Sequence, residues 1–198
     1  MRPDVFLALT LFCVVAGVTP GPNNMMLMAS GVNYGVRRTL PHLTGVVVGF
    51  ALMVALVGFG LDAIFRVAPW LLPLMRWLGA AYLVWLAWRI ANSGAVKAGA
   101  AQGRPLGVLA AAAFQWINPK GWVMAVSALT TYAVSADYAT TVGVVALTCL
   151  IVSVPCSGVW VLFGAGMRRA LADPRRARPF NWTMGALLVA SIAPVFWE

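Results

Sequence analysis

Two short polar segments interrupt long apolar runs, and they hold the residues whose types are suited to chemistry. The first covers residues 19–24 and the second residues 115–120. Each combines proline with hydroxyl, amide or ammonium groups, and a few such polar groups in an apolar setting are typical of a site for a small solute. The candidate binding residues are Thr19, Pro20, Gly21, Pro22, Asn23, Asn24, Gln115, Asn118, Pro119 and Lys120.

Both segments contain a helix-capping residue type followed directly by proline. Thr19 precedes Pro20, and Asn118 precedes Pro119. Thr and Asn are favoured at the N-cap, and proline is favoured at the first helical position. Each pair therefore predicts the start of a half-helix, whose unpaired N–H groups and positive dipole end attract an anion such as a carboxylate.

Lys120 is the charged group of these segments. An ammonium inside a membrane costs about 2.5–3.5 kcal/mol on insertion scales, so it marks a functional site by default. It would bind a substrate carboxylate, or it would instead snorkel or donate to a backbone carbonyl. The amides of Asn23, Asn24 and Gln115 would hold an amino group or satisfy the breaks, and the prolines would then be packing kinks.

The remaining reactive side chains give little support for catalysis or for a metal. The carboxylates fall at the ends of apolar runs or between them, which disfavours paired acid and base catalysis. His42, the single histidine, is expected to be solvated beside Arg37 and Arg38. We expect no metal and no cofactor, and we expect small packing residues at Cys13, Cys149 and Cys156.

Two hydroxyls flank a proline in a later apolar run. Ser153 and Ser157 lie on either side of Pro155. Proline is expected to bend a helix there, and such hydroxyls often bond back to carbonyls of their own helix. Whether this bend has a binding role stays open.

The elements that carry these groups are expected to be apolar helices in a membrane. Of the 198 residues, 62% are hydrophobic and 10% are charged, and the mean hydropathy is +0.87. A soluble domain has about 25% charged residues. Because a spanning helix uses about 20 apolar residues, the chain has room for six spans with short loops, and we expect one transmembrane domain over residues 1–198.

Six spans are expected, and the first and fourth contain the polar segments. Their ranges are 5–31, 41–61, 74–91, 107–132, 140–165 and 180–196. Three spans in each half make the halves run in opposite directions, and Pro20 and Pro119 are 99 positions apart, which is half the chain. The predicted fold is an all-α integral membrane protein with two inverted three-helix repeats, about 1–92 and 105–198, each with an interrupted first helix.

Basic residues predict the orientation of this bundle. One side holds ten Lys and Arg residues, namely Arg37, Arg38, Arg89, Lys97, Arg104, Arg168, Arg169, Arg175, Arg176 and Arg178; the other holds Arg2, Arg66 and Arg76. Cytoplasmic loops carry such an excess, so both termini are predicted to be extracytoplasmic. Anionic lipid explains the net charge of +9 better than nucleic acid, which we do not expect as a partner.

Glycines at a spacing of four residues predict close helix packing. Gly45 and Gly49 form one such pair, and Gly17 and Gly21 form another. Small residues let two helix backbones approach each other. The contact would lie inside the bundle or on the face of a homodimer.

Several motifs in order resemble the LysE/RhtB family of bacterial amino-acid exporters. They are TPGPNN at 19–24, GVRR at 35–38, Gly45 and Gly49 with Phe50, WLGAAYL at 77–83 with Arg89, and NPK at 118–120. The resemblance covers nearly the whole chain. It implies a six-helix protein of the bacterial inner membrane that exports amino acids or close derivatives, and it does not imply which amino acid.

We therefore expect a secondary transporter rather than an enzyme. The carboxylate of an amino-acid substrate would lie at the half-helix starts and at Lys120, and its amino group at the nearby amides. One alternative is an accessory or structural membrane subunit, in which the breaks only shape packing. Another is an enzyme acting on a lipid substrate, for which the bundle offers only His42 and Lys120.

Overall fold

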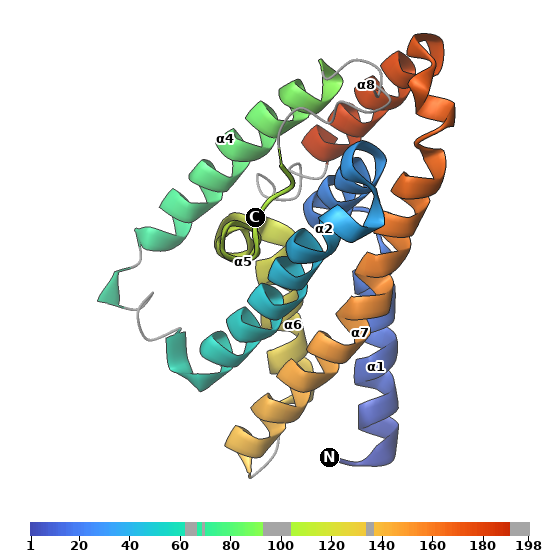
Figure 1. Cartoon of the computed structure of the whole chain (residues 1–198). Coiled ribbons are helices and arrows are strands. Elements are labelled where there is room, and N and C mark those ends of the chain that lie inside the picture. The colour runs from blue at the N-terminus through green and yellow to red at the C-terminus, as the bar shows by residue number, and fades with distance from the viewer. Residues whose placement is uncertain (62–66, 69, 93–103, 134–136, 191–198) are drawn as a thin grey trace.

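The computed structural model describes residues 1–61, 67–68, 70–92, 104–133 and 137–190, and within these ranges it contains helices and no strand (Figure 1). The α-helices are α1 (Pro3–Val18), α2 (Pro22–Leu56), α4 (Leu71–Ala91), α5 (Val108–Phe114), α6 (Pro119–Tyr132), α7 (Tyr138–Met167) and α8 (Pro174–Ala190). Short turns of other helix types are η1 (Val57–Leu61), η2 (Gln115–Ile117) and η3 (Ala170–Ala172). The predicted all-helical class is confirmed.

The first break separates α1 from α2. Helix α1 ends at Val18, and Gly21, in an extended conformation, precedes Pro22 at the first position of α2. The prediction that Thr19 and Pro20 start the half-helix is therefore wrong by two residues. The sequence contains two prolines at alternate positions, Pro20 and Pro22, and either is suited to the first helical position; the structure uses the second.

A sharp turn at one residue separates the two arms of α2. At Gly35 φ is 75° and ψ is 173°, so residues 22–34 correspond to the end of the first predicted span and residues 36–56 to the second. That backbone conformation is essentially restricted to glycine. The second arm begins before the expected position 41, so Arg37 and Arg38 lie in helix rather than in a loop. Pro41 lies inside α2, and the π-type turn η1 extends the helix to Leu61.

The later spans agree with expectation except at their ends. Helices α4 and α7 match the third and fifth predicted spans, and α5, η2 and α6 together match the interrupted fourth. Helix α8 begins at Pro174, six residues before the expected start at Phe180. Arg175, Arg176 and Arg178 therefore lie in helix rather than loop, and the predicted end at 196 lies outside the described residues.

The helices pack around a central pair, α2 and α7 (Figure 1). Helix α1 packs on α7, and α5 packs on α2, so each broken helix contacts the long helix of the other half. Helices α4 and α8 pack on each other. This arrangement brings the two breaks, far apart in sequence, to the middle of one bundle.

Glycines make the α2–α5 contact possible. A Cβ atom placed on Gly49 would lie 2.5 Å from the Ala112 Cα atom, and one on Gly45 would meet the Val108 carbonyl. Gly17 packs on Cys156 of α7 in the same manner. The predicted close packing is confirmed, and these glycines face neighbours within the chain.

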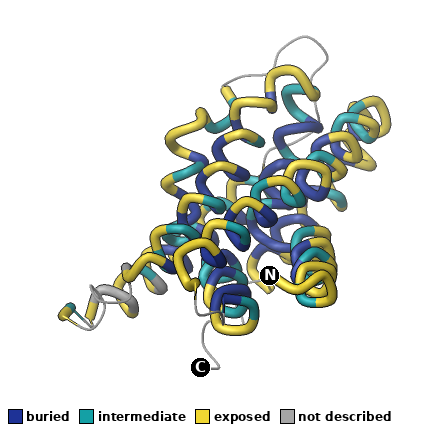
Figure 2. Tube along the Cα trace, turned by 90° about the horizontal axis from the view of Figure 1, so that it is seen from below, coloured by how far each residue is buried: buried dark blue, intermediate teal, exposed yellow. Residues whose placement is uncertain are grey.

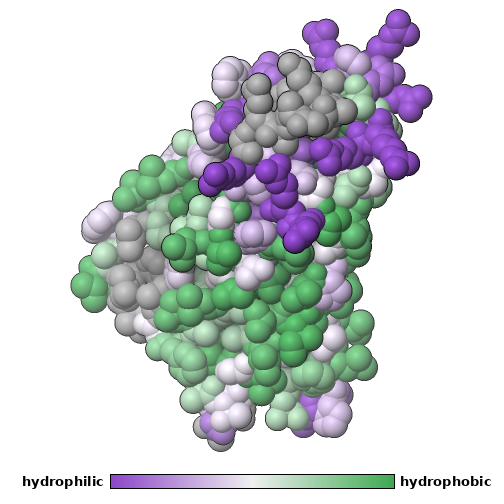
Figure 3. Space-filling view, in the orientation of Figure 1, coloured by the Kyte–Doolittle hydropathy of each residue, from purple (hydrophilic) through white to green (hydrophobic). Residues whose placement is uncertain are grey.

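The outer surface is apolar around the bundle, and basic groups gather at one end. Exposed residues run along the outer faces of the helices (Figure 2), and they include Leu7, Val15, Phe59, Ile151 and Leu162. The hydrophilic surface lies mainly over the end of α7 and the start of α8, opposite the N-terminus (Figures 1 and 3). Two described helical stretches, Pro22–Gly60 and Tyr138–Met167, are long and apolar enough to cross a membrane.

Candidate functional site

The two breaks touch through the side chain of Lys120. Its Nζ atom donates to the Thr19 carbonyl at 2.7 Å, to Thr19 Oγ1 at 2.9 Å and to the Pro20 carbonyl at 3.4 Å. Its methylenes lie against Gly21, where a Cβ atom would come within 2.6 Å of Lys120 Cδ. A side chain at position 21 would displace this lysine.

The position of Lys120 makes electrostatic sense because it lies at the carboxyl end of α1. The last carbonyls of a helix lack donors from their own helix and form the negative end of its dipole. An ammonium placed there is stabilised. The sequence left open whether Lys120 binds a substrate carboxylate or donates to backbone carbonyls. The structure shows the bonds to carbonyls, and Lys120 also lines the cavity described below.

Asn24 satisfies further carbonyls at the end of α1. Its Nδ2 atom donates to the carbonyls of Gly17 and Thr19, both at 2.8 Å. Thr19 Oγ1 donates back to the Ala16 carbonyl at 2.8 Å. The carbonyls freed by the break thus find side-chain partners, which stabilises an interrupted helix in an apolar surrounding.

Asn23 and Gln115 join the two breaks by a reciprocal amide pair. Asn23 Nδ2 donates to Gln115 Oε1 at 2.8 Å, and Gln115 Nε2 donates to Asn23 Oδ1 at 3.2 Å. Gln115 Nε2 also donates to the Ala111 carbonyl at 2.9 Å. Their amides are therefore engaged with each other in this conformation.

Asn118 differs from the other amides because its oxygen has no partner. It is the N-cap of α6, with Pro119 at the first helical position, as the sequence predicts. The side chain makes no capping bond and is 2% exposed. Its Oδ1 atom is buried without a hydrogen bond. An unpartnered buried acceptor costs about 1–3 kcal/mol, so a ligand that donates to it is stabilised.

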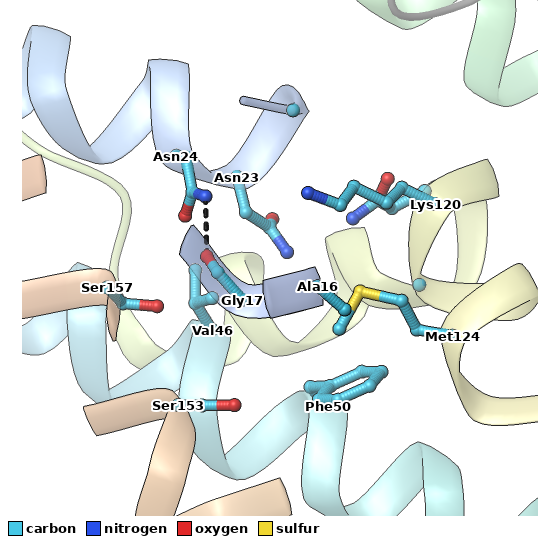
Figure 4. A pocket seen from close by; sticks show the side chains of 13 residues that line it. Ala16, Gly17, Asn23, Asn24, Val46, Phe50, Lys120, Met124, Ser153 and Ser157 are labelled. Carbon is cyan, nitrogen blue, oxygen red and sulfur yellow. Dashed lines mark hydrogen bonds between the residues drawn. The ribbon is translucent and has the colours of Figure 1, made fainter. Parts of the chain in front are cut away.

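One cavity lies between the breaks, with a volume of about 40 Å³ (Figure 4). It is lined by the first residues of both half-helices and by side chains from α1, α2 and α7, namely Ala16, Gly17, Gly21, Asn23, Asn24, Val46, Phe50, Asn118, Lys120, Gly121, Met124, Ser153 and Ser157. At 10–15 Å³ per water the space is enough for about three waters. This volume is smaller than an amino acid, so the cavity is closed to one in this conformation.

Part of the cavity wall was missed by the sequence reasoning. Val46 and Met124 are apolar residues within long apolar runs, and nothing in the sequence separates them from their neighbours. Phe50 was noted only as part of a family motif, without a role in the site. Ser153 and Ser157 were noticed only as a bend. A small polar residue on either side of Pro155 is the signal that could have pointed to the cavity.

His42 is buried, against the expectation that it is solvated. It is 1% exposed, its Nδ1 atom lies 2.9 Å from Ser30 Oγ, and its Nε2 atom has no partner. The reason is the kink at Gly35, which brings the two arms of α2 together so that Ser30 and His42 meet. The basic neighbours in sequence, Arg37 and Arg38, are on the exposed side.

The cysteines pack between α1 and α7, as predicted. The sulfur atoms of Cys13 and Cys149 lie 3.5 Å apart, and Cys156 contacts α1 at Gly17. All three are buried and free. Among the described residues no group of three His, Cys, Asp or Glu side chains is placed to hold a metal ion.

Comparison with known proteins assigns the family. Residues 14–196 match the LysE type translocator family. The chain belongs to the LysE translocator family. Relatives include the cysteine/O-acetylserine efflux proteins of Escherichia coli strain K12 and of Shigella sonnei strain Ss046, each 31% identical over 100% of both chains. No solved structure matches.

Membership of the LysE translocator family settles the broad class. The apolar helices are those of a membrane protein, and the efflux names of the relatives indicate a transporter of small molecules rather than an enzyme. The resemblance drawn from the TPGPNN, WLGAAYL and NPK motifs is confirmed.

Proposed function

We propose that this protein is a secondary transporter that exports a small amino acid, or an amino-acid derivative, from the cytoplasm across the bacterial inner membrane. One observation carries the proposal. The first residues of two half-helices, α2 and α6, line the same cavity in the middle of the bundle. Discontinuous helices that meet in this way form the substrate sites of other transporters.

The groups around the cavity suit the two charged ends of an amino acid. The opening N–H groups of α2 and α6 have no partner within their own helices and favour a carboxylate. The free Oδ1 atom of Asn118 accepts from the substrate ammonium. Lys120 adds positive charge beside the carboxylate while it holds the end of α1.

The remaining predicted site residues shape the cavity rather than bind directly. The amide pair of Asn23 and Gln115 fixes the distance between the breaks. Asn24 donates hydrogen bonds to carbonyls at the end of α1. Pro20, Gly21, Pro22 and Pro119 end one helix and start the next, and Thr19 accepts the bond from Lys120.

The packing supports two inverted repeats within a single transmembrane domain. Contacts of α1 with α7 correspond to those of α5 with α2, and the pairs α2 with α7 and α4 with α8 each join equivalent helices. In this proposal residues 1–92 and 105–198 are the repeats and provide six spans. Rocking of one repeat against the other would open the closed cavity to each side in turn.

The distribution of charge supports an orientation with the basic end in the cytoplasm. Hydrophilic residues gather at the end of the bundle away from the N-terminus (Figure 3). Of the basic residues used for the prediction, Arg66 and Lys97 lie outside the described residues. The proposal places both termini outside. A homodimer loses the support of Gly45 and Gly49, since both face α5.

Cysteine and O-acetylserine are the first candidate substrates. The relatives are named as cysteine/O-acetylserine efflux proteins, and the cavity combines polar groups with the apolar side chains of Phe50 and Met124. A small amino acid with a short side chain fits such a wall better than a long cationic one, since no carboxylate lines this cavity.

The proposal is tested by loading cells with a panel of labelled amino acids and following their retention with and without the gene. The same cells then express Asn118→Ala, with Asn92→Ala as the control. Asn92 is exposed at the end of α4 and donates only to its own helix. We expect faster loss of cysteine or O-acetylserine with the wild-type protein. Asn118→Ala should slow this loss by about ten- to hundredfold, because a hydrogen bond to a charged group contributes about 1.5–3 kcal/mol.

An unchanged retention of every amino acid would contradict the exporter. Export that survives Asn118→Ala at the wild-type rate would instead remove this residue from the site. The amount of inserted protein, measured by immunoblot of membranes, makes the rates comparable.

A further inference from the structure

Most threonine hydroxyls inside the described helices bond back to their own helix. Six threonines donate to the carbonyl four residues earlier in their own helix, at 2.8–2.9 Å: Thr10, Thr39, Thr130, Thr141, Thr148 and Thr183. This is the usual way to satisfy a hydroxyl in an apolar helix. These side chains have no spare donor for a ligand.

Ser153 and Ser157 do not follow this pattern. They lie one turn apart on α7 around Pro155, and neither hydroxyl has a hydrogen-bond partner within the described part of the chain. Both line the cavity, and Figure 4 shows their oxygen atoms directed into it, Ser157 toward Gly17 and Val46 and Ser153 toward Phe50. Ser157 is 6% exposed, and its Oγ atom is not among the fully buried atoms without a partner, so this hydroxyl is reached from the cavity.

The two serines lie on a different wall from the groups assigned to the substrate backbone. The half-helix starts and Asn118 come from α2 and α6, whereas the serines come from α7 (Figure 4). An amino acid held by its carboxylate and ammonium on the first wall would direct its side chain toward another. Phe50 and Met124 form the apolar remainder of the cavity.

We propose that Ser153 and Ser157 bind the side chain of the substrate. They would select small amino acids whose side chains carry a hydrogen-bonding group, such as a thiol, a hydroxyl or an ester. The inference rests on the proposed function. A serine hydroxyl both donates and accepts, so it pairs with a thiol or hydroxyl as well as with an ester carbonyl. A substrate that lacks the polar atom leaves these hydroxyls unpaired in a closed cavity, which disfavours its transport.

The test compares exchange of labelled amino acids across vesicles that contain the purified full-length protein. Exchange needs no driving ion. The probes are L-serine, L-cysteine and L-2-aminobutyrate, which has a methyl group in place of the hydroxyl or thiol. One net hydrogen bond corresponds to about a tenfold difference in rate. We therefore expect the wild-type protein to exchange serine and cysteine about ten times faster than 2-aminobutyrate, or more.

The substitutions Ser153→Ala and Ser157→Ala should each lower this preference by about three- to tenfold, mainly by slowing the polar substrates. Ser157→Thr, which keeps a hydroxyl, should retain more of the preference than Ser157→Ala. Ser127→Ala in α6 is the control, because Ser127 lies outside the cavity lining. It should keep the wild-type ratio.

The outcomes separate this inference from the proposed function. If the wild-type protein exchanges amino acids without distinguishing serine and cysteine from 2-aminobutyrate, the serine role is wrong and the exporter stands. The same holds if both alanine variants keep the wild-type ratio. If the wild-type protein exchanges no amino acid, the proposed function fails. If an alanine variant does not insert into the membrane, the preference of the wild-type protein for serine and cysteine over 2-aminobutyrate still tests the inference.

Discussion

Lys120 links the two halves of the chain through a single ammonium group. It belongs to α6 but satisfies carbonyls at the end of α1, about one hundred residues earlier in the sequence. Where a helix is interrupted in an apolar surrounding, its freed carbonyls need such side-chain donors. The cost of burying Lys120 is thus offset by the bonds that hold the broken helix.

Lys120→Met should therefore lower both stability and transport. The methionine keeps the packing on Gly21 but removes the donor to the Pro20 carbonyl and one of the two donors to the Thr19 carbonyl, which keeps its bond from Asn24, a loss of about 1–3 kcal/mol. The midpoint of thermal unfolding in detergent measures the effect, with Arg175→Met, an exposed position, as the control. A midpoint equal to that of the wild-type protein would show that these bonds do not stabilise the break.

At the scale of single residues, the sequence identified polar positions better than it identified their roles. The ten candidate residues all fall at the two breaks. Residue type alone does not reveal that Asn23 pairs with Gln115 while Asn118 stays unpaired, because both facts depend on how the halves dock. His42 was misjudged for the same reason, since its partner Ser30 lies across a kink.

At the scale of helices, the contact between α2 and α5 depends on the absence of a side chain at Gly49. Gly49→Ala would place Cβ 2.5 Å from the backbone of Ala112, so the helices must move apart. Overpacking of this kind costs about 1–3 kcal/mol. Gly143→Ala in α7 is the matched control, because a Cβ atom there meets nothing within 4 Å.

The comparison of unfolding midpoints for the two alanine variants decides this point. Gly143→Ala should be neutral or stabilise slightly, since alanine favours helix over glycine by about 1 kcal/mol. Equal effects of the two substitutions would refute close packing at Gly49.

The kink in α2 depends on Gly35 for a different reason, namely its backbone. Any side chain at φ 75° and ψ 173° is strained, by about 1–3 kcal/mol. Gly35→Ala should thus lower the unfolding midpoint although the nearest neighbour of its Cβ atom, on Arg168, is 3.6 Å away. Gly166→Ala in α7 provides the comparison, as that position has an ordinary helical backbone and open space. An unaffected Gly35→Ala protein would mean that the kink relaxes readily.

Element boundaries were predictable where proline or a change in hydropathy marks them. The interrupted fourth span was located correctly at Asn118 and Pro119. The turn between the first two spans was expected to be a loop of several residues, but it occupies the single residue Gly35, whose backbone conformation periodicity does not report. Helix α8 starts early because its arginines extend a helix beyond the apolar run that marked the span.

At the scale of the molecule, the two breaks provide polarity where the rest of the bundle is apolar. The outer faces expose large hydrophobic residues, whereas the cavity between α1, α2, α6 and α7 holds amides, hydroxyls and an ammonium. Among the described residues, a polar solute is thereby favoured at the level of this cavity. The sequence predicted this level from its two polar segments, but it left open that α7 contributes a wall.

The most direct test of the account asks whether an amino acid occupies this cavity. Gly121→Cys places a thiol on the cavity wall, where a Cβ atom has its nearest neighbour at 3.6 Å, in a chain whose Cys13, Cys149 and Cys156 are replaced by alanine. Gly143→Cys, outside the cavity, is the control. Alkylation of each thiol is timed in vesicles with and without O-acetyl-L-serine.

We expect O-acetyl-L-serine at about ten times its Kd to slow alkylation at Gly121→Cys by about tenfold, since only the unoccupied protein reacts, and to leave Gly143→Cys unaffected. If the Gly121→Cys protein exchanges O-acetyl-L-serine while its thiol reacts equally fast with and without the amino acid, the substrate passes elsewhere and the site proposed here is wrong.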